Sequence, residues 1–205
     1  MGLYSRLVLP RLVHLACSGE QVERQRAKVV PMARGRVLEI GIGSGLNLPF
    51  YDPARVSRVL GLEPSAEMIA LAEQAADEAP FDVEFLLAGS EAIPLPSGSC
   101  DTVVVTYALC TIPDVVAALK EMGRVLKAGG NLLFCEHGLA PDANVRKWQD
   151  RVDPAWRRLA GGCHLNRDIP ALLRSGDFQT TSLDTMYVPG WRPASFEYWG
   201  SAVPR

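Results

Sequence analysis

Apolar residues along the chain are grouped into short runs that alternate with longer, amphipathic segments. The apolar-rich runs lie at residues 37–40, 58–62, 82–87, 102–106 and 131–135. Runs of this length are typical of parallel strands, because both faces of a parallel sheet are covered. Residues 112–126 have apolar positions at helical spacing, with Pro113 in the first turn and Gly129-Gly130 after the end, which predicts a helix. The pattern therefore indicates an α/β fold.

The segments on either side of this core complete the predicted fold. Two helices are expected before the first strand, at residues 4–16, with a kink at Pro10, and at residues 20–32. Two more are expected after the fifth strand, at residues 144–150 and 169–173. Alternating runs at residues 178–186 and 196–203 predict an antiparallel pair at the sheet edge. The expected fold is a doubly wound, mostly parallel seven-stranded sheet with N-terminal helices and a C-terminal antiparallel strand pair.

The composition of the chain limits the classes of protein to which it can belong. The chain is 48% hydrophobic and 21% charged with a net charge of -2, which is ordinary for a globular enzyme. Because there is no excess of positive charge, we expect no nucleic-acid partner. The cysteines are dispersed and form no C-x-x-C pair, which favours free thiols in a reducing cytoplasm and predicts no metal site.

No membrane-spanning segment is expected, because no apolar run reaches the length of a transmembrane helix. No signal peptide is evident either, since Pro10 and Arg11 interrupt the apolar residues 7–9. We therefore expect a cytoplasmic location. Peripheral contact of residues 4–16 with a membrane surface stays an alternative, although the basic residues are few.

The most informative stretch is V-L-E-I-G-I-G-S-G at residues 37–45, where an apolar run ends in Glu39. Glycines follow at alternate positions: Gly41, Gly43 and Gly45. They indicate a tight turn that a ligand approaches closely, and such a turn after the first strand is where doubly wound sheets bind nucleotides. The dinucleotide fingerprint G-x-G-x-x-G is not matched, because Leu46 stands at its third glycine, and this disfavours an NAD-dependent oxidoreductase.

A second acid ends the next strand. Glu63 follows the run at residues 58–62, and a carboxylate at this place can accept hydrogen bonds from two neighbouring ribose hydroxyls. The alternative is an exposed charge at a strand end. Pro64-Ser65 then begins a helix, with Ser65 as its N-cap.

Four further motifs, together with these residues, resemble the motifs of a known family. They are G-L-E-P-S at 61–65, S-E-A-I-P-L-P at 90–96, D-T-V-V-V-T at 101–106 and R-V-L-K-A-G-G at 124–130. With the glycine loop, they resemble the class I S-adenosylmethionine (SAM) methyltransferases over residues 36–137. The resemblance implies SAM as methyl donor and S-adenosylhomocysteine as product. It also implies that the glycines pass under the amino-acid part of SAM and that Glu39 anchors its ammonium.

The resemblance implies further cofactor contacts. Asn47 adds a polar contact, and Met68 rests against the adenine, with a plain core position as an alternative for Met68. Gly89 replaces the acid that commonly accepts from the adenine amino group, so the implied contact moves to Ser90 and Glu91. The remaining implied cofactor residues are Glu63, Pro64, Thr106 and Leu109.

A narrower resemblance covers the last third of the chain. C-E-H at 135–137, D-P-A-W at 153–156 and G-C-x-L-x-R at 162–167 look like segments of the thiol S-methyltransferase group. This implies a small, apolar acceptor, either a thiol or a quinone- or lipid-like molecule. His137 and His164 are then candidate catalytic residues that favour a thiolate, and the alternative for each is a core histidine. The implied reaction is a direct displacement that needs no metal.

We therefore expect one methyltransferase domain over residues 1–205. Residues 1–35 would be N-terminal helices and a candidate lid, 36–137 the SAM-binding core, and 138–205 the acceptor-side helices and final strands. A non-catalytic SAM-binding protein on the same fold stays an alternative, because a fold does not determine a reaction.

Overall fold

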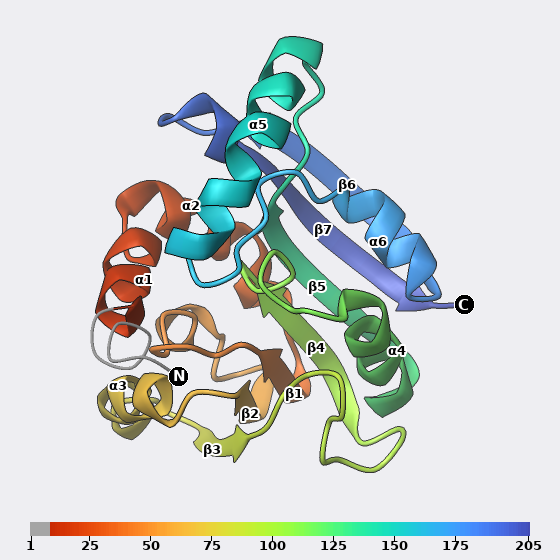
Figure 1. Cartoon of the computed structure of the whole chain (residues 1–205). Coiled ribbons are helices and arrows are strands. Elements are labelled where there is room, and N and C mark those ends of the chain that lie inside the picture. Colours follow the sequence, from red (N-terminus) through yellow and green to blue (C-terminus); the bar gives the residue numbers. More distant parts are fainter. Residues whose placement is uncertain (1–8) are drawn as a thin grey trace.

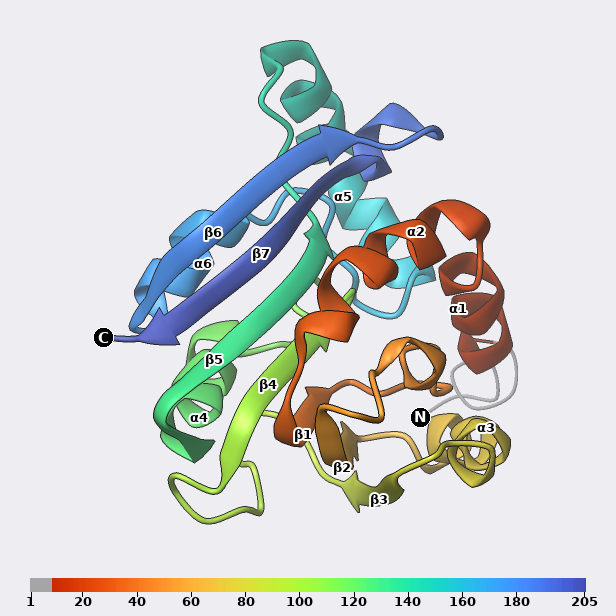
Figure 2. The same ribbon diagram turned by 180° about the vertical axis from the view of Figure 1, so that it is seen from behind.

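The computed structural model describes residues 9–205 and contains a seven-stranded sheet covered by helices on both faces (Figures 1 and 2). The strands are β1 (Gly35–Ile40), β2 (Val56–Glu63), β3 (Asp82–Leu87), β4 (Cys100–Thr106), β5 (Leu126–His137), β6 (Phe178–Tyr187) and β7 (Phe196–Pro204). Their order across the sheet is β3-β2-β1-β4-β5-β7-β6. The first five strands pair in parallel, whereas β7 lies antiparallel between β5 and β6. The predicted fold class is confirmed.

The helices account for the rest of the described chain. They are α1 (Leu9–Cys17), α2 (Glu20–Val29), α3 (Ala66–Asp77), α4 (Val115–Val125), α5 (Ala143–Leu159) and α6 (Ile169–Ser175), with short 3₁₀ helices at Val30–Met32, Leu48–Phe50 and Arg192–Ala194. Residues 4–8 of the first predicted helix lie outside the described residues. Among the described residues, no helix combines the length and the apolar character needed to cross a membrane.

Two predicted helix boundaries were wrong for identifiable reasons. Helix α4 begins at Val115 rather than at residue 112, because the Asp114 side chain accepts a hydrogen bond from the Ala117 N–H and caps the helix there. Helix α5 continues through Pro154, whereas the pattern indicated an end at residue 150. Hydrogen bonds to distant segments stabilise the middle of the helix. Gln149 Nε2 donates to three backbone carbonyls, and Asp153 accepts from the Leu165 N–H at 2.8 Å.

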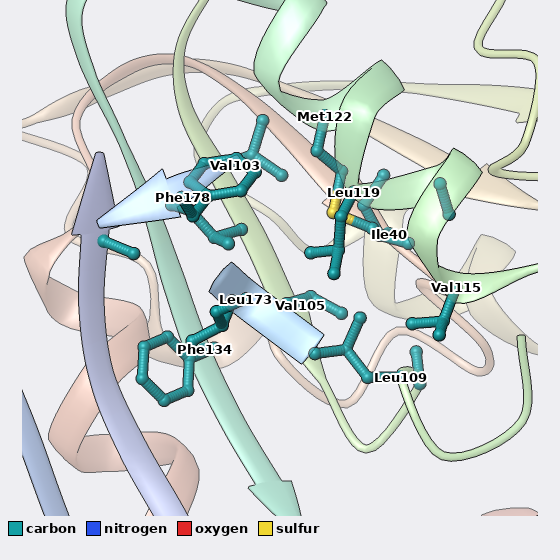
Figure 3. Close-up of a cluster of buried hydrophobic side chains, with 14 of the residues drawn as sticks. Ile40, Val103, Val105, Leu109, Val115, Leu119, Met122, Phe134, Leu173 and Phe178 are labelled. Carbon is teal, nitrogen blue, oxygen red and sulfur yellow. The ribbon is translucent and has the colours of Figure 1, made fainter. Parts of the chain in front are cut away.

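The sheet separates two hydrophobic clusters, because successive strand residues point to opposite faces. Val103 and Val105 of β4 belong to the larger cluster, which contains Leu119 and Met122 of α4 and residues of α6 (Figure 3). Val104 belongs to the second cluster, with residues of α2, the Leu48–Phe50 helix and α3. Burial on both faces fixes the register of the central strands and brings their carboxyl ends to one edge.

Candidate active site

The glycine loop after β1 adopts a backbone conformation that favours glycine. Gly41, Gly43 and Gly45 have φ values of 64°, 57° and 79°. A Cβ on Gly41 would lie 2.9 Å from Ala108 Cβ, and a Cβ on Gly43 would lie 3.3 Å from Met68 Cε. The loop is therefore packed between the segment after β4 and the first turn of α3, and it leaves no room for side chains.

Glu63 holds this loop in place. One of its carboxylate oxygens accepts from the Gly43 N–H at 3.1 Å and the other accepts from the Ser65 N–H at 3.1 Å. Glu63 is mostly buried, and burial raises the pKa of its carboxyl although the two backbone donors lower it. The predicted strand-end acid thus links the loop to the start of α3.

Glu39 lies below the loop in the interior. Its two oxygens accept from Asn47 Nδ2 at 2.9 Å and from the Tyr51 hydroxyl at 2.7 Å. Burial is the largest influence and raises the pKa of Glu39 to about 7, against the hydrogen bonds and the charge of Arg26, which lower it. Glu39 therefore acts on its surroundings through Asn47 and Tyr51.

Arg26 is a site residue that the sequence pattern did not reveal. Its Nη1 donates to Asn47 Oδ1 and to Thr106 Oγ1, both at 2.7 Å, and its side chain lies 5.2 Å from the centre of the Tyr107 ring. The residue is only 5% exposed, and its Nε has no hydrogen-bond partner among the described residues. No motif surrounds it, because it lies on one face of an ordinary charged helix, α2.

The glycine loop and Arg26 border a cavity of about 60 Å³ at the carboxyl edge of the sheet, and Glu39, Asn47 and Glu63 do not line it. Helix α1 covers the cavity, and His14 Nδ1 lies 2.7 Å from Ser44 Oγ in the glycine loop. Four predicted residues line it: Gly41, Gly43, Met68 and Thr106. Seven further lining residues were not predicted: His14, Cys17, Arg26, Ile42, Ser44, Leu46 and Tyr107. The cavity is far smaller than the roughly 300–1,000 Å³ typical of small-molecule sites.

Other predicted cofactor residues lie around the cavity without lining it. A Cβ on Gly45 would lie 3.2 Å from both Ala75 Cβ and Leu48 Cδ1, and Pro64 is exposed. Ser90 is buried, and Glu91 accepts from the Asp114 N–H at 3.5 Å. Leu109 is buried in the larger core, and its N–H donates to Glu136.

A cluster of two cysteines and one histidine lies beside these residues. The sulfurs of Cys110 and Cys163 and a ring nitrogen of His137 lie within 4.8 Å of one another. His137 Nε2 is 3.2 Å from Cys163 Sγ. A hydrogen bond from Cys110 lowers the pKa of Cys163 against the effect of burial, and His137 lowers it further. Burial lowers the pKa of His137, but its bond to Cys163 and the negative charges of Cys163, Glu197 and Glu136 together outweigh this and raise it.

His164 does not join this cluster. Its Nδ1 lies 3.6 Å from Asp153 Oδ2 on α5, and burial together with the positive charge of Arg167 lowers its pKa. Its backbone N–H donates to the Cys110 carbonyl at 2.9 Å. The structure therefore brings His137 to the edge with the cysteines and places the His164 side chain against α5.

Comparisons with known proteins identify the family. Residues 38–134 match the methyltransferase domain family. Thiol S-methyltransferase TMT1B of Rattus norvegicus is 31% identical over 170 residues, which is 82% of this chain and 70% of that protein. The chain belongs to the SAM-dependent methyltransferases, and SAM is its cofactor.

Two further proteins are similar to this chain. A phosphatidylethanolamine N-methyltransferase of Cereibacter sphaeroides is 33% identical over 120 residues, 58% of each chain. The crystal structure of a SAM-dependent methyltransferase from Thermotoga maritima has a TM-score of 0.66 at 20% identity and covers 98% of this chain and 99% of that one. This last likeness concerns the fold alone.

Proposed function

We propose that this SAM-dependent methyltransferase methylates the sulfur of a small, apolar thiol. The observation that carries the proposal is the length of the match to the rat thiol S-methyltransferase, 82% of the chain. This exceeds residues 38–134 of the family core and so takes in segments outside it. The lipid methyltransferase matches only 58% of the chain.

The residues around the cavity are suited to hold SAM. The bare backbone of Gly41 and Gly43, which lines the cavity, receives the amino-acid part. Arg26 Nε, which has no partner among the described residues, is a donor for the SAM carboxylate, and Glu39 supports the ammonium through Asn47. Glu63 accepts from the ribose hydroxyls. Adenine binds among Met68, Pro64, Ser90 and Glu91, with Thr106 and Leu109 shaping the side toward the acceptor.

The acceptor would bind beside the Cys110, His137 and Cys163 cluster. SAM supplies an electrophilic methyl group on its sulfonium. The chain contributes alignment of the acceptor, exclusion of water and a local environment that favours a thiolate. The indole rings of Trp156 and Trp191, with centroids 5.5 Å apart, add apolar surface on the α5 side for an uncharged acceptor.

The test combines binding with an acceptor panel. Calorimetry should detect binding of SAM and S-adenosylhomocysteine and no binding of NAD. Methyl release should then occur with small aryl or alkyl thiols and rise with pH toward the pKa of the thiol. Turnover only with phenols, amines, quinones or phospholipids would refute the thiol and favour the lipid- or quinone-type alternative. SAM binding without turnover on any acceptor would favour a non-catalytic role.

Histidine variants refine this test. His137→Gln should lower turnover without a matching loss of SAM affinity, because His137 lies beside Cys163. His164→Gln is the matched comparison and should lower turnover less, because that side chain faces Asp153. Equal losses in both variants would contradict the assignment of His137.

The cysteine thiols also favour a particular cellular location. All five cysteines are free, which suits a reducing compartment such as the cytoplasm.

A further inference from the structure

The cysteine–histidine cluster has the composition of a metal site. Its members come from three separate segments: Cys110 from the turn after β4, His137 from the end of β5, and Cys163 from the loop between α5 and α6. The sequence pattern predicted no metal, because neighbouring ligands such as C-x-x-C are not present. Only the fold brings these three ligands together.

The spacing of the ligand atoms fits a tetrahedral ion. Zinc bonds of about 2.3 Å to sulfur and 2.0–2.1 Å to nitrogen place tetrahedral ligands about 3.6–3.8 Å apart. The three atoms here lie within 4.8 Å of one another, and the His137 to Cys163 distance is 3.2 Å. The separations therefore differ from those of a tetrahedral site by about 1 Å at most, and small movements of the side chains would form the site. Two thiolates and a neutral imidazole also balance the charge of a divalent ion.

We propose that Cys110, His137 and Cys163 bind a zinc ion and leave its fourth coordination position open. Two cysteines and one histidine form a ligand set used by catalytic zinc, which keeps one position for water or substrate. Glu197 lies opposite His137 in the β5–β7 pairing, and Glu136 precedes His137. Each has a buried carboxylate oxygen without a hydrogen-bond partner among the described residues.

The cluster lies next to residues that line the cavity, which gives the open position a role. Cys110 Sγ lies 3.6 Å from the Tyr107 carbonyl, and Tyr107 lines the cavity. Cys17 also lines the cavity, and its thiol interacts electrostatically with Cys163. A ligand at the fourth position would therefore be close to Tyr107 and Cys17 in the cavity wall.

This role rests on the proposed function, with the acceptor thiol as the fourth ligand. The thiol would release its proton to solvent and bind zinc as thiolate. Its sulfur would form a bond to the methyl carbon of SAM while the carbon–sulfonium bond breaks and its electron pair stays on S-adenosylhomocysteine. The neutral thioether binds zinc more weakly than the thiolate and leaves.

Metal binding can be measured separately from methyl transfer. The full chain would be incubated with zinc under reducing conditions, desalted and analysed for bound metal. Cobalt(II) substitution would report thiolate ligands through sulfur-to-cobalt charge-transfer absorption. We expect one zinc per chain, with affinity at least about ten-fold weaker in Cys110→Ser, Cys163→Ser and His137→Gln. Cys100→Ser is the matched control, because Cys100 is also buried but begins β4 at the opposite edge.

The outcomes separate the metal site from the thiol acceptor. No zinc in the reduced wild type, or equal binding in the ligand variants and in Cys100→Ser, would overturn the site. So would a Cys110–Cys163 disulfide in place of metal under the same reducing conditions. Thiol methylation at an unchanged rate after zinc removal would overturn the role of the fourth position. Zinc binding without thiol methylation would keep the site and refute the proposed acceptor.

Discussion

At the scale of single residues, Gly43 combines a backbone requirement with a place on the cavity wall. Its φ is 57°, and an added Cβ would lie 3.3 Å from Met68 Cε. We expect Gly43→Val to lose detectable SAM binding and to destabilise the fold by about 1–2 kcal/mol through the left-handed conformation. Calorimetry and chemical denaturation would measure the two effects.

A second glycine separates backbone strain from loss of the cavity. Gly98 has a φ of 63°, and a Cβ added at this position would meet no other atom within 4 Å. Gly98→Val should therefore show a similar loss of stability with unchanged SAM affinity. Wild-type SAM affinity in Gly43→Val would mean that the loop does not touch the cofactor.

Glu39 should make stability depend on pH. Burial raises its pKa from 4.5 to about 7 in the folded chain. Because the folded pKa is the higher one, Glu39 favours the folded state most below pH 4.5, and this contribution is lost as the pH rises through about 7. Relative to Glu39→Gln, the free energy of unfolding of the wild type should fall by about 2–3 kcal/mol between about pH 5 and pH 8.

Chemical denaturation at several pH values measures this difference. Glutamine can still accept from Asn47, and its amide can donate to the Tyr51 hydroxyl, so the variant keeps the local bonds. Other titrating groups cancel in the comparison of the two proteins. A difference that does not change with pH would show that Glu39 titrates at its ordinary pKa.

Some of the cavity residues could be predicted from the sequence and others could not. Four predicted residues line the cavity: Gly41, Gly43, Met68 and Thr106. They were predictable because the spacing of glycines and the ends of strands can be recognised from neighbouring residues in the sequence. Arg26 was not predicted, since its neighbours form an ordinary charged helix and its partners lie far along the chain. Their roles in binding SAM stay predictions.

At the scale of elements, we predict that α1 controls access to the cavity. The cavity of about 60 Å³ is smaller than the sites that usually hold a nucleoside cofactor, so we expect α1 to move outward when SAM enters. The contact between His14 and Ser44 opposes this movement. A hydrogen bond of about 1 kcal/mol corresponds to about a five-fold change in rate. We expect His14→Ala to accelerate both association and dissociation of SAM by about this factor.

Stopped-flow fluorescence would measure both rates. Arg11→Ala is the control, because Arg11 is exposed on the same helix. Unchanged rates in His14→Ala would refute α1 as the gate, whereas equal acceleration in both variants would point to general loosening of the helix.

Elements differ in how well local patterns predict them. The span of β3 was predicted to the residue and those of β2, β6 and β7 to within a few, because apolar runs are bounded by turn residues. Helix α5 was predicted too short, because Gln149 and Asp153 stabilise it through bonds to distant segments. Sequence patterns do not contain those partners.

At the scale of the whole molecule, one sheet joins the cofactor half to the C-terminal half. The two core clusters lie on opposite faces of the same strands, and β7 pairs with β5 along its length. The apolar and alternating runs predicted a mostly parallel sheet with an antiparallel pair at its edge, but they did not predict the strand order. The meeting of Cys110, His137 and Cys163 was not predictable, because it depends on where the loop after α5 returns.

The shared sheet predicts that SAM stabilises residues 1–205 as one cooperative unit. The four tryptophans lie in the C-terminal half, at Trp148, Trp156, Trp191 and Trp199, whereas the glycine loop follows β1. SAM at about 100 times its dissociation constant adds about 2.7 kcal/mol of stability. For a chain of this length the expected rise in Tm is about 5–10 °C. Tryptophan fluorescence and far-UV circular dichroism should both show this rise in a single transition. A rise in the circular dichroism transition alone would show that the C-terminal half unfolds independently and would refute the single domain.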